Sequence, residues 1–435
     1  MDDIPLLDIF NQLTLLDMTV LAMLGILMAY FFFSNQMHVL MFLLVFSAAS
    51  VSTTIPIISS IASLTRWLIL PLLLVAGLIF SKVRISFGML MFWGYVFLGF
   101  VSLFRADYFL WQFQRSILLV TVAIAVPFAY SNKDIKTYKL ALISISLAAT
   151  AYSLINFIGL PSSLSDPMRY AGYAKSAPAM AATLGGVLPF TIWGAQNADS
   201  KWVKRICVLG FLLGTVTLIF SAQRAGTIAG VLGLIPLLAI TLSQRKTAIS
   251  SILLLAFLGL IGYLLLIQSS ADRITFLLSR YALNSGLSDR EFLWQKAISE
   301  IAINPFWGNG IGAAEKLISS SFHNAYLEIW YNTGIFGLIF FVISQLYFLS
   351  RTFYLWRQRT DSFAISISAL SIGYMMGFLV LCLFESIGAG ASNLNLILYL
   401  FLEVLVSNYV TSNKSISQGR IQPYLLNSDL KAIQQ

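Results

Sequence analysis

His323 and Asn324 form the motif of this sequence that is best suited to chemistry. Nine residues separate them from a second element, Gly334-Ile-Phe-Gly337, and a basic loop precedes them. Imidazole exchanges protons near neutral pH, so a histidine at the end of a polar loop can accept a proton from a hydroxyl group. The chain has only one other histidine, His38, which stands at the end of an apolar segment and is interpreted as structural. We therefore predict that His323 is a general base, with Asn324 as a supporting residue.

Two arginines are candidates for binding an anion beside His323. Arg224 stands in a very short connection between two apolar segments, where a charge is costly unless it is paired or lies in a water-filled cavity. Arg290 falls in the first turn of a predicted helix, next to unpaired backbone N–H groups that favour a bound phosphate. Alternatives stay open: Arg224 could be an interfacial anchor, and Arg290 could pair with Asp289 or Glu291.

Three further residues are supporting candidates because they lie on the same predicted side of the membrane as His323. Glu385 ends a late apolar segment and could orient or charge the imidazole. The equal alternative for Glu385 is a helix-end carboxylate in water. Arg169 and Lys175 lie in a preceding loop on that side and add positive charge for an anionic ligand.

The composition determines what kind of structure must position these residues. The chain has 435 residues, of which 58% are hydrophobic and 10% are charged. A water-soluble globular protein carries more charge on its surface. Apolar runs of about 17–25 residues recur from end to end, and each is long enough to cross a bilayer. The predicted fold class is therefore all-α, a polytopic integral membrane protein.

The hydropathy pattern predicts about twelve or thirteen transmembrane helices. They lie near residues 16–33, 38–62, 67–80, 88–104, 116–130, 140–160, 178–195, 206–222, 227–243, 249–268, 324–350, 363–384 and 394–410. The stretch 38–62 contains Thr53, Thr54 and Pro56 in the middle of its run, so it could be a broken helix.

One long loop, 269–323, interrupts what we interpret as a single transmembrane domain, 1–435. Its first part, 272–283, has the pattern of an amphipathic helix lying on the membrane. A second helix is predicted to start in the capping box Ser288-Asp-Arg-Glu291 and to stop at Asn304-Pro305. Its apolar face would consist of Phe292, Leu293, Trp294, Ile298 and Ile301.

Positive charge predicts the orientation of the chain in the membrane. Basic residues recur in alternate short loops, which marks those loops as cytoplasmic and the loop 269–323 as periplasmic. The opposite side nevertheless carries many arginines, whose planar forks suit phosphate. Among them, Arg105, Arg115 and Arg273 are interpreted as head-group anchors. The remaining arginines predict a site for an anionic, phosphorylated, lipid-linked ligand.

Several other kinds of site are not supported by the sequence. Cys207 and Cys382 both fall inside apolar segments and are interpreted as small buried side chains, not as a disulfide or metal pair. No metal-binding pattern and no cofactor motif is recognised. The net charge of +9 is spread over short loops, which favours membrane lipids over nucleic acid as partners.

Together these segments resemble the O-antigen ligase and polymerase superfamily of bacterial envelope glycan enzymes. The resemblance is carried by Arg169-Tyr-Ala-Gly172, Ser221-Ala-Gln-Arg224-Ala-Gly226, Asp289-Arg290 with Trp294, Pro305-Phe-Trp-Gly308-Asn-Gly310, and the His323-Asn324-x9-Gly-x-x-Gly337 element. It covers the second half of the chain and the overall hydropathy profile.

The resemblance implies a metal-independent membrane glycosyltransferase without a cofactor. Such an enzyme moves a glycan from undecaprenyl diphosphate, with its active site at the periplasmic face of the bacterial inner membrane. His323 would deprotonate the acceptor hydroxyl, and Arg224 and Arg290 would bind the diphosphate. Direct displacement at the anomeric carbon would invert its configuration.

Three functions compete at this stage. An O-antigen ligase transfers the glycan to a lipid A-core acceptor, and the compact loop before His323 favours it slightly. A polymerase of O-antigen or exopolysaccharide uses another lipid-linked glycan as acceptor. A lipid-linked glycan transporter is the second alternative, but such folds usually contain paired repeats, which this sequence does not show.

Overall fold

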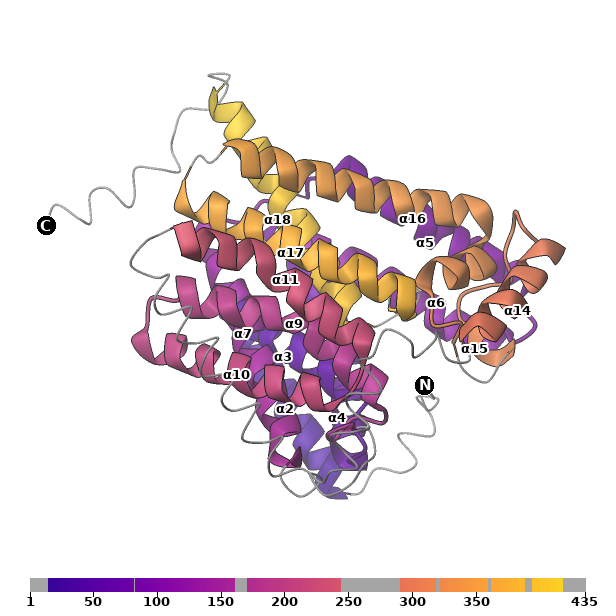
Figure 1. Cartoon of the computed structure of the whole chain (residues 1–435), viewed down its shortest axis with the longest axis horizontal. Coiled ribbons are helices and arrows are strands. Elements are labelled where there is room, and N and C mark those ends of the chain that lie inside the picture. Colours follow the sequence, from indigo (N-terminus) through magenta and orange to yellow (C-terminus); the bar gives the residue numbers. More distant parts are fainter. Residues whose placement is uncertain are drawn as a thin grey trace, which may run out of the picture.

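The computed structural model describes residues 15–81, 83–160, 170–243, 290–317, 321–358, 361–387 and 393–417. In these ranges the regular elements are helices, and the only strand-like pairing is an isolated antiparallel bridge between Thr53 and Ala174. The helices lie roughly side by side along the molecule (Figure 1). The predicted all-α fold class is confirmed.

The described helices have the following bounds: α2 Leu15–Phe33, α3 Met37–Ser50, α4 Pro56–Phe80, α5 Phe87–Val101, the 3-10 helix η1 Ser102–Arg105, α6 Phe109–Tyr130, α7 Ile135–Ile158, α9 Ala177–Asn197, α10 Lys201–Phe220, α11 Arg224–Ser243, α14 Arg290–Ile303, α15 Ala313–Leu317, α16 Ala325–Gln358, α17 Ser362–Phe384 and α18 Leu394–Ser417. Within the described ranges, eight helices are long and apolar enough to cross a membrane, and α3 and α11 contain shorter apolar helices. The chain is a multi-pass membrane protein. The predicted helix 249–268 lies outside the described residues.

Two predicted helices have different bounds in the structure. The alternative that 38–62 is a broken helix is confirmed, because α3 ends at Ser50 and α4 begins at Pro56. The predicted separation between 62 and 67 is wrong, since α4 continues to Phe80. Pro56 is the first residue of α4, where its missing N–H costs no hydrogen bond. The Thr53 hydroxyl donates to the Tyr173 carbonyl at 2.8 Å, and the Thr54 amide donates to the same oxygen at 2.6 Å. Hydrogen bonds to the segment before α9 therefore fix the connection between α3 and α4.

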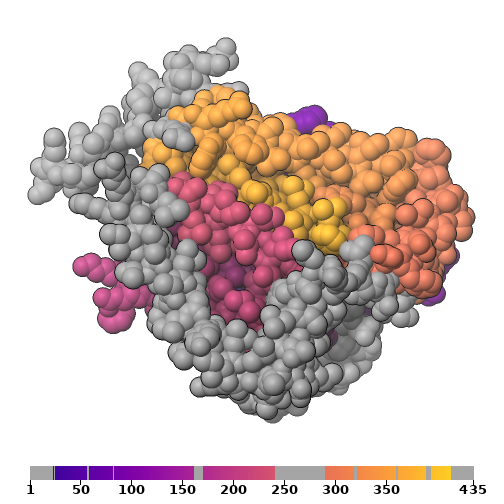
Figure 2. All heavy atoms as spheres, in the orientation of Figure 1, coloured from indigo at the N-terminus to yellow at the C-terminus, as the bar shows by residue number. Residues whose placement is uncertain are grey.

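Small residues set the register between α11 and α17. A Cβ atom on Gly373 would lie 2.1 Å from the carbonyl oxygen of Gly233, and one on Gly377 would lie 2.7 Å from that of Ala229. These pairs run in opposite directions along the two helices, so the helices are antiparallel and their backbones nearly touch. In Figure 2 the red surface of α11 borders the orange and yellow surface of the C-terminal helices. The register brings the start of α11 to the end of α17.

The long helix α16 is kinked at Gly334, which has φ 75° and ψ 177°. The residues around this kink bind the turn that follows α14. The Ile335 amide donates to Pro305 O at 2.9 Å, and the Gly310 amide donates to Asn332 O at 2.8 Å. A Cβ atom on Gly334 would lie only 1.9 Å from the Phe306 carbonyl oxygen. The glycine is therefore required for α14 and its turn to pack against α16.

The loop before His323 contains the second of the two helices that were predicted for it. Helix α14 runs from Arg290 to Ile303 and stops before Asn304-Pro305, as predicted. Its predicted apolar face is only partly buried, since Ile301 is buried whereas Phe292 and Ile298 are exposed. The predicted helix 272–283 and the capping residue Ser288 lie outside the described residues.

Candidate active site

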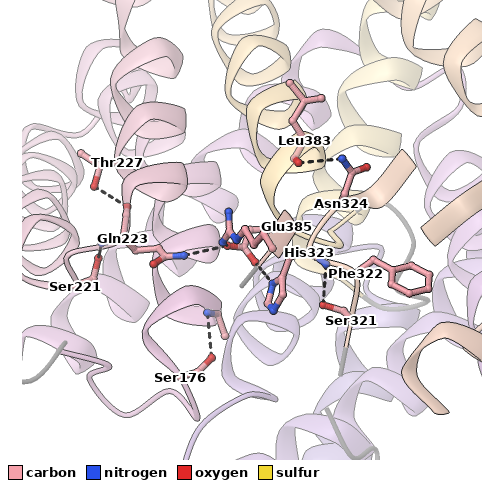
Figure 3. A network of polar contacts seen from close by, with 12 residues as sticks. Ser176, Ser221, Gln223, Thr227, Ser321, Phe322, His323, Asn324, Leu383 and Glu385 are labelled. Atoms are coloured by element: carbon pink, nitrogen blue, oxygen red, sulfur yellow. Dashed lines mark hydrogen bonds and ion pairs between the residues drawn. The ribbon is translucent and has the colours of Figure 1, made fainter. Parts of the chain in front are cut away.

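Glu385 is the centre of a polar cluster at one end of α17. It follows the last helical residue, and its own amide donates to Leu381 O at 2.7 Å. The residue is only 7% exposed. A buried carboxylate is stable only when charged or hydrogen-bonding partners replace water. Figure 3 shows these partners converging on Glu385 from segments far apart in the sequence.

The two carboxylate oxygens of Glu385 have different partners. Oε1 accepts from Arg290 Nη2 at 2.8 Å and from Gln223 Nε2 at 3.0 Å. Oε2 lies 3.1 Å from His323 Nδ1. One carboxylate thus joins the turn before α11, the start of α14 and the segment before α16. Glu385 is therefore buried in contact with the imidazole and is not a helix-end carboxylate in water. That it orients or charges the imidazole stays a prediction.

His323 is held between α14 and α16 in a strained backbone conformation. Its φ angle is 50°, in the left-handed region that non-glycine residues rarely occupy. The preceding residue, Phe322, is fully buried, and its carbonyl accepts from Trp294 Nε1 at 3.0 Å. The imidazole itself remains 29% exposed. When Nδ1 carries the proton that it donates to Glu385, Nε2 is left with a lone pair for a substrate.

The side chain of Asn324, the residue after His323, forms two hydrogen bonds. Its Oδ1 accepts from the Leu327 amide at 3.0 Å, which caps the start of α16. Its Nδ2 donates to Leu383 O at 3.2 Å, at the end of α17. Figure 3 shows this second bond above the cluster. Asn324 therefore ties the His323 segment to the helix that carries Glu385.

Arg290 is the first residue of α14 and points toward Glu385 rather than toward its neighbour Glu291. Its side chain is 19% exposed. A guanidinium has five N–H groups, and the ion pair with Glu385 uses Nη2. The ion pair thus fixes the arginine while leaving donors that can face an anion.

Arg224 is the first residue of α11 and is half-buried. It follows Gln223, whose amide binds Glu385, and a tight turn at Ala222 with φ 53°. Arg224 therefore lies at a helix N-terminus one residue from the cluster, where backbone N–H groups favour an anion. Sequence reasoning did not select Gln223. The only signal was its place beside Arg224 in a short apolar connection.

Two further predicted residues are not part of the hydrogen-bonded cluster. Lys175 is exposed, and its backbone amide donates to Ser52 O at 2.6 Å. Within the described ranges, no hydrogen bond links its ammonium group to Glu385 or His323. The next residue, Ser176, caps α9 and is seen below the cluster in Figure 3. Arg169 lies outside the described residues.

The interpretation of Arg115 as a head-group anchor is wrong. Arg115 is 7% exposed, and its Nη2 forms an ion pair with Glu315 Oε2 at 2.8 Å. Its guanidinium carbon also lies 4.6 Å from the centre of the Trp111 ring. The exposed Arg105 donates to Asn304 Oδ1 at 2.9 Å, and Arg273 lies outside the described residues.

The acidic, histidine and cysteine side chains of the described ranges are too dispersed for a metal centre. Among these residues, no group of three or more His, Cys, Asp or Glu side chains could hold a metal ion. Cys207 and Cys382 are both buried free thiols.

Comparison with known proteins adds an independent observation. A family model described as O-antigen ligase matches residues 209–342. No curated protein matches the chain. The matched region includes Arg224, Arg290 and His323, whereas Glu385 lies beyond it and joins the site through the fold. This match supports the resemblance of the chain to the O-antigen ligase and polymerase superfamily.

Proposed function

We propose that the protein is an O-antigen ligase. It transfers a glycan from undecaprenyl diphosphate to a lipid A-core acceptor at the periplasmic face of the inner membrane. The observation that carries this proposal is the position of Glu385, which binds both Arg290 and His323. A base for a sugar hydroxyl and a cation for a diphosphate thus share one buried carboxylate. The family match favours lipid-linked glycan chemistry.

His323 acts as the general base. Its Nε2 takes the proton from the acceptor hydroxyl, and the oxygen attacks the anomeric carbon of the donor sugar. The bond from that carbon to the diphosphate oxygen breaks, and undecaprenyl diphosphate leaves with the electron pair. Glu385, 3.1 Å from Nδ1, stabilises the imidazolium that forms. A single displacement inverts the anomeric configuration.

Arg290 and Arg224 bind the diphosphate and neutralise the charge that grows as it leaves. Arginine is suited to this role because its planar fork makes two parallel hydrogen bonds to phosphate oxygens. The N-terminus of α11 adds backbone N–H groups next to Arg224. Since these groups supply the positive charge, the proposed mechanism needs no divalent metal.

A reconstitution tests the proposal. Purified protein in liposomes receives undecaprenyl diphosphate-linked oligosaccharide, with and without lipid A-core, and the products are separated by mass. Glycan on the core, formed only when core is present, supports the ligase. A ladder of longer lipid-linked chains without core identifies a polymerase. Donor that crosses the bilayer without covalent change identifies a transporter and overturns the enzyme proposal.

A further inference from the structure

Large apolar side chains are exposed at the end of the molecule that carries α14 and α15 (Figure 1). They come from two stretches that lie far apart in the sequence, residues 104–110 and the end of α14 with the turn that follows it. The exposed residues are Phe104, Phe109, Leu110, Ile303, Phe306 and Trp307, and we call them the apolar rim. An exposed apolar cluster of this kind marks an interaction surface, so the rim requires a partner.

Hydrogen bonds hold the two stretches of the apolar rim together. The carbonyl of Trp307 accepts from Ser102 Oγ at 3.0 Å, which joins η1 to the turn after α14. The carbonyl of Asn309 in the same turn accepts from Gln112 Nε2 of α6 at 2.8 Å. Both donor residues are buried. The rim is therefore one preassembled surface and not two independent loop tips.

Helices α5 and α16 pack side by side and have exposed apolar faces of their own. The exposed residues are Leu90, Phe97 and Phe100 on α5 and Phe336, Ile339 and Leu346 on α16. Spacings of three and seven residues keep side chains on one face of a helix. Both helices belong to apolar segments that are long enough to cross a membrane. These two faces are therefore in contact with lipid.

Aromatic contacts join the lipid-facing helices to the apolar rim. The ring centroid of Phe336 on α16 lies 6.3 Å from that of Phe306 in the rim. The ring of Phe100 on α5 lies 6.4 Å from that of Phe113 on α6. Phe113 in turn stacks on Phe109 of the rim, with 5.6 Å between the ring centroids. The rim is thus continuous with the surface that contacts lipid.

The partners of the apolar rim place it at the edge of a membrane span. The span that contains α5 runs from Phe87 to Arg105, and Ser102, which binds the Trp307 carbonyl, lies just before its end. Arg105 is exposed, and its Nη2 donates to Asn304 Oδ1 at 2.9 Å. Aromatic side chains next to an arginine are typical of the head-group level of a bilayer.

The kink of α16 gives the same depth for the rim. Next to the kink at Gly334, the Ile335 amide donates to Pro305 O in the turn after α14 at 2.9 Å. Arg351 and Arg357 follow on α16, about 26 and about 35 Å from the kink at the rise of an α-helix. These distances bracket the thickness of a hydrocarbon core, about 30 Å. When the two arginines lie at one head-group level, the kink and the rim therefore lie at the other.

We propose that the apolar rim is a membrane anchor that inserts into the lipid leaflet on the side of the candidate active site. Its partner is phospholipid. The apolar side chains contact the upper part of the acyl chains, and Arg105 pairs with lipid phosphate. The rim includes Ile303, the last residue of α14, whereas the first residue, Arg290, binds Glu385 at 2.8 Å. Helix α14 is thus held by lipid at one end and by the Glu385 cluster at the other.

Spin labelling of the full-length protein in phosphatidylcholine–phosphatidylglycerol liposomes tests the anchor. Labels are placed at Trp307→Cys in the rim, at Ile339→Cys on the lipid-facing side of α16 and at Asp199→Cys, an exposed carboxylate position. The native cysteines are buried and so do not compete for the label. Oxygen concentrates in hydrocarbon, whereas a nickel chelate stays in water. We expect oxygen to relax the label at Trp307→Cys more than nickel does, as at Ile339→Cys, and the reverse at Asp199→Cys.

Two outcomes of this experiment would overturn the proposal. A response at Trp307→Cys that is dominated by nickel would place the rim in water. Protection from both reagents would show that protein covers the rim, and broadening of the spectrum by a second label would identify that protein as another copy of the chain.

A second measurement needs no cysteine variant. Phosphatidylcholine with brominated acyl chains quenches tryptophans that lie in the bilayer. Trp307→Phe keeps an aromatic ring and should lower the fraction of tryptophan emission that the brominated lipid quenches. The matched control is Trp193→Phe, at a fully buried tryptophan, which should not lower it. An unchanged quenched fraction in Trp307→Phe would contradict the anchor. Neither readout depends on glycan transfer.

Discussion

Glu385 Oε2 lies 3.1 Å from His323 Nδ1, although the two residues are 62 positions apart. In the proposed mechanism this contact orients the imidazole so that its second nitrogen remains for a substrate. The same carboxylate binds Arg290, which is proposed to bind the diphosphate. The proposed base and this arginine are therefore coupled through Glu385. Loss of this carboxylate should therefore disturb both groups at once.

Replacing His323 should remove the chemical step and leave donor binding intact. We expect His323→Ala to lower the rate of glycan transfer by about 10²–10⁴-fold, the range that general base catalysis contributes. Product formation in liposomes measures the rate, and retention of lipid-linked oligosaccharide on purified protein measures binding. His38→Ala is the matched control, because this second histidine lies at the start of α3, and it should transfer normally. Loss of donor binding alone in His323→Ala would indicate a structural role.

Replacing Glu385 by glutamine should impair transfer more than it impairs folding. The amide removes the negative charge that stabilises the imidazolium and leaves Arg290 beside a neutral group. We expect a reduction of roughly 100-fold or more in turnover. Glu291→Gln removes an exposed carboxylate from the same end of α14 and should have no comparable effect. Wild-type turnover in Glu385→Gln would contradict the proposed role of this carboxylate.

Arg290 should require its planar fork and not only its charge. Arg290→Lys keeps the cation but loses bidentate contact with a diphosphate. We expect Arg290→Ala to lower transfer by about 10²–10³-fold and Arg290→Lys to recover only part of that loss. Arg105→Lys, at an exposed arginine that binds Asn304, serves as the control. Full activity in Arg290→Lys would show that a point charge suffices.

Gly334 should be essential for stability although it touches no substrate. Gly334→Ala forces a side chain into a positive-φ conformation that is essentially restricted to glycine, at a cost of about 1–3 kcal/mol, and places its Cβ 1.9 Å from Phe306 O. We expect a clear drop in the melting temperature of the purified protein, accompanied by loss of transfer. Gly25→Ala is the control, since a Cβ there meets nothing within 4 Å. Equal melting temperatures for Gly334→Ala and Gly25→Ala would contradict the proposed packing.

Chelation of divalent metals should not stop the reaction. The proposed mechanism assigns the neutralisation of the diphosphate to Arg224 and Arg290. Transfer by the purified, chelator-treated protein should therefore match that of untreated protein. A loss of activity that is restored by magnesium or manganese would refute this part of the mechanism.

Much of the fold could be predicted from the sequence. Apolar runs of membrane-spanning length determine a polytopic helical protein, because unpaired backbone groups are too costly in hydrocarbon. The end of α14 before Asn304-Pro305 was predicted correctly for a local reason, the inability of proline to continue a helix. The break before Pro56 was harder to place. Its position depends on hydrogen bonds from Thr53 and Thr54 to Tyr173, which is distant in the sequence.

The candidate site, like the fold, combines features that could be predicted from the sequence with features that only the tertiary structure decided. The sequence by itself determined the residue types that are able to do the chemistry. They are a histidine in a polar loop, which can exchange protons near neutral pH, and arginines close to the membrane, where a charge is costly. Only the tertiary structure decided that Glu385 is the common partner of His323 and Arg290 and that Gln223 joins them. The antiparallel contact of α11 with α17 brings these two side chains together. Such a contact depends on backbone approach between helices, which no local pattern encodes.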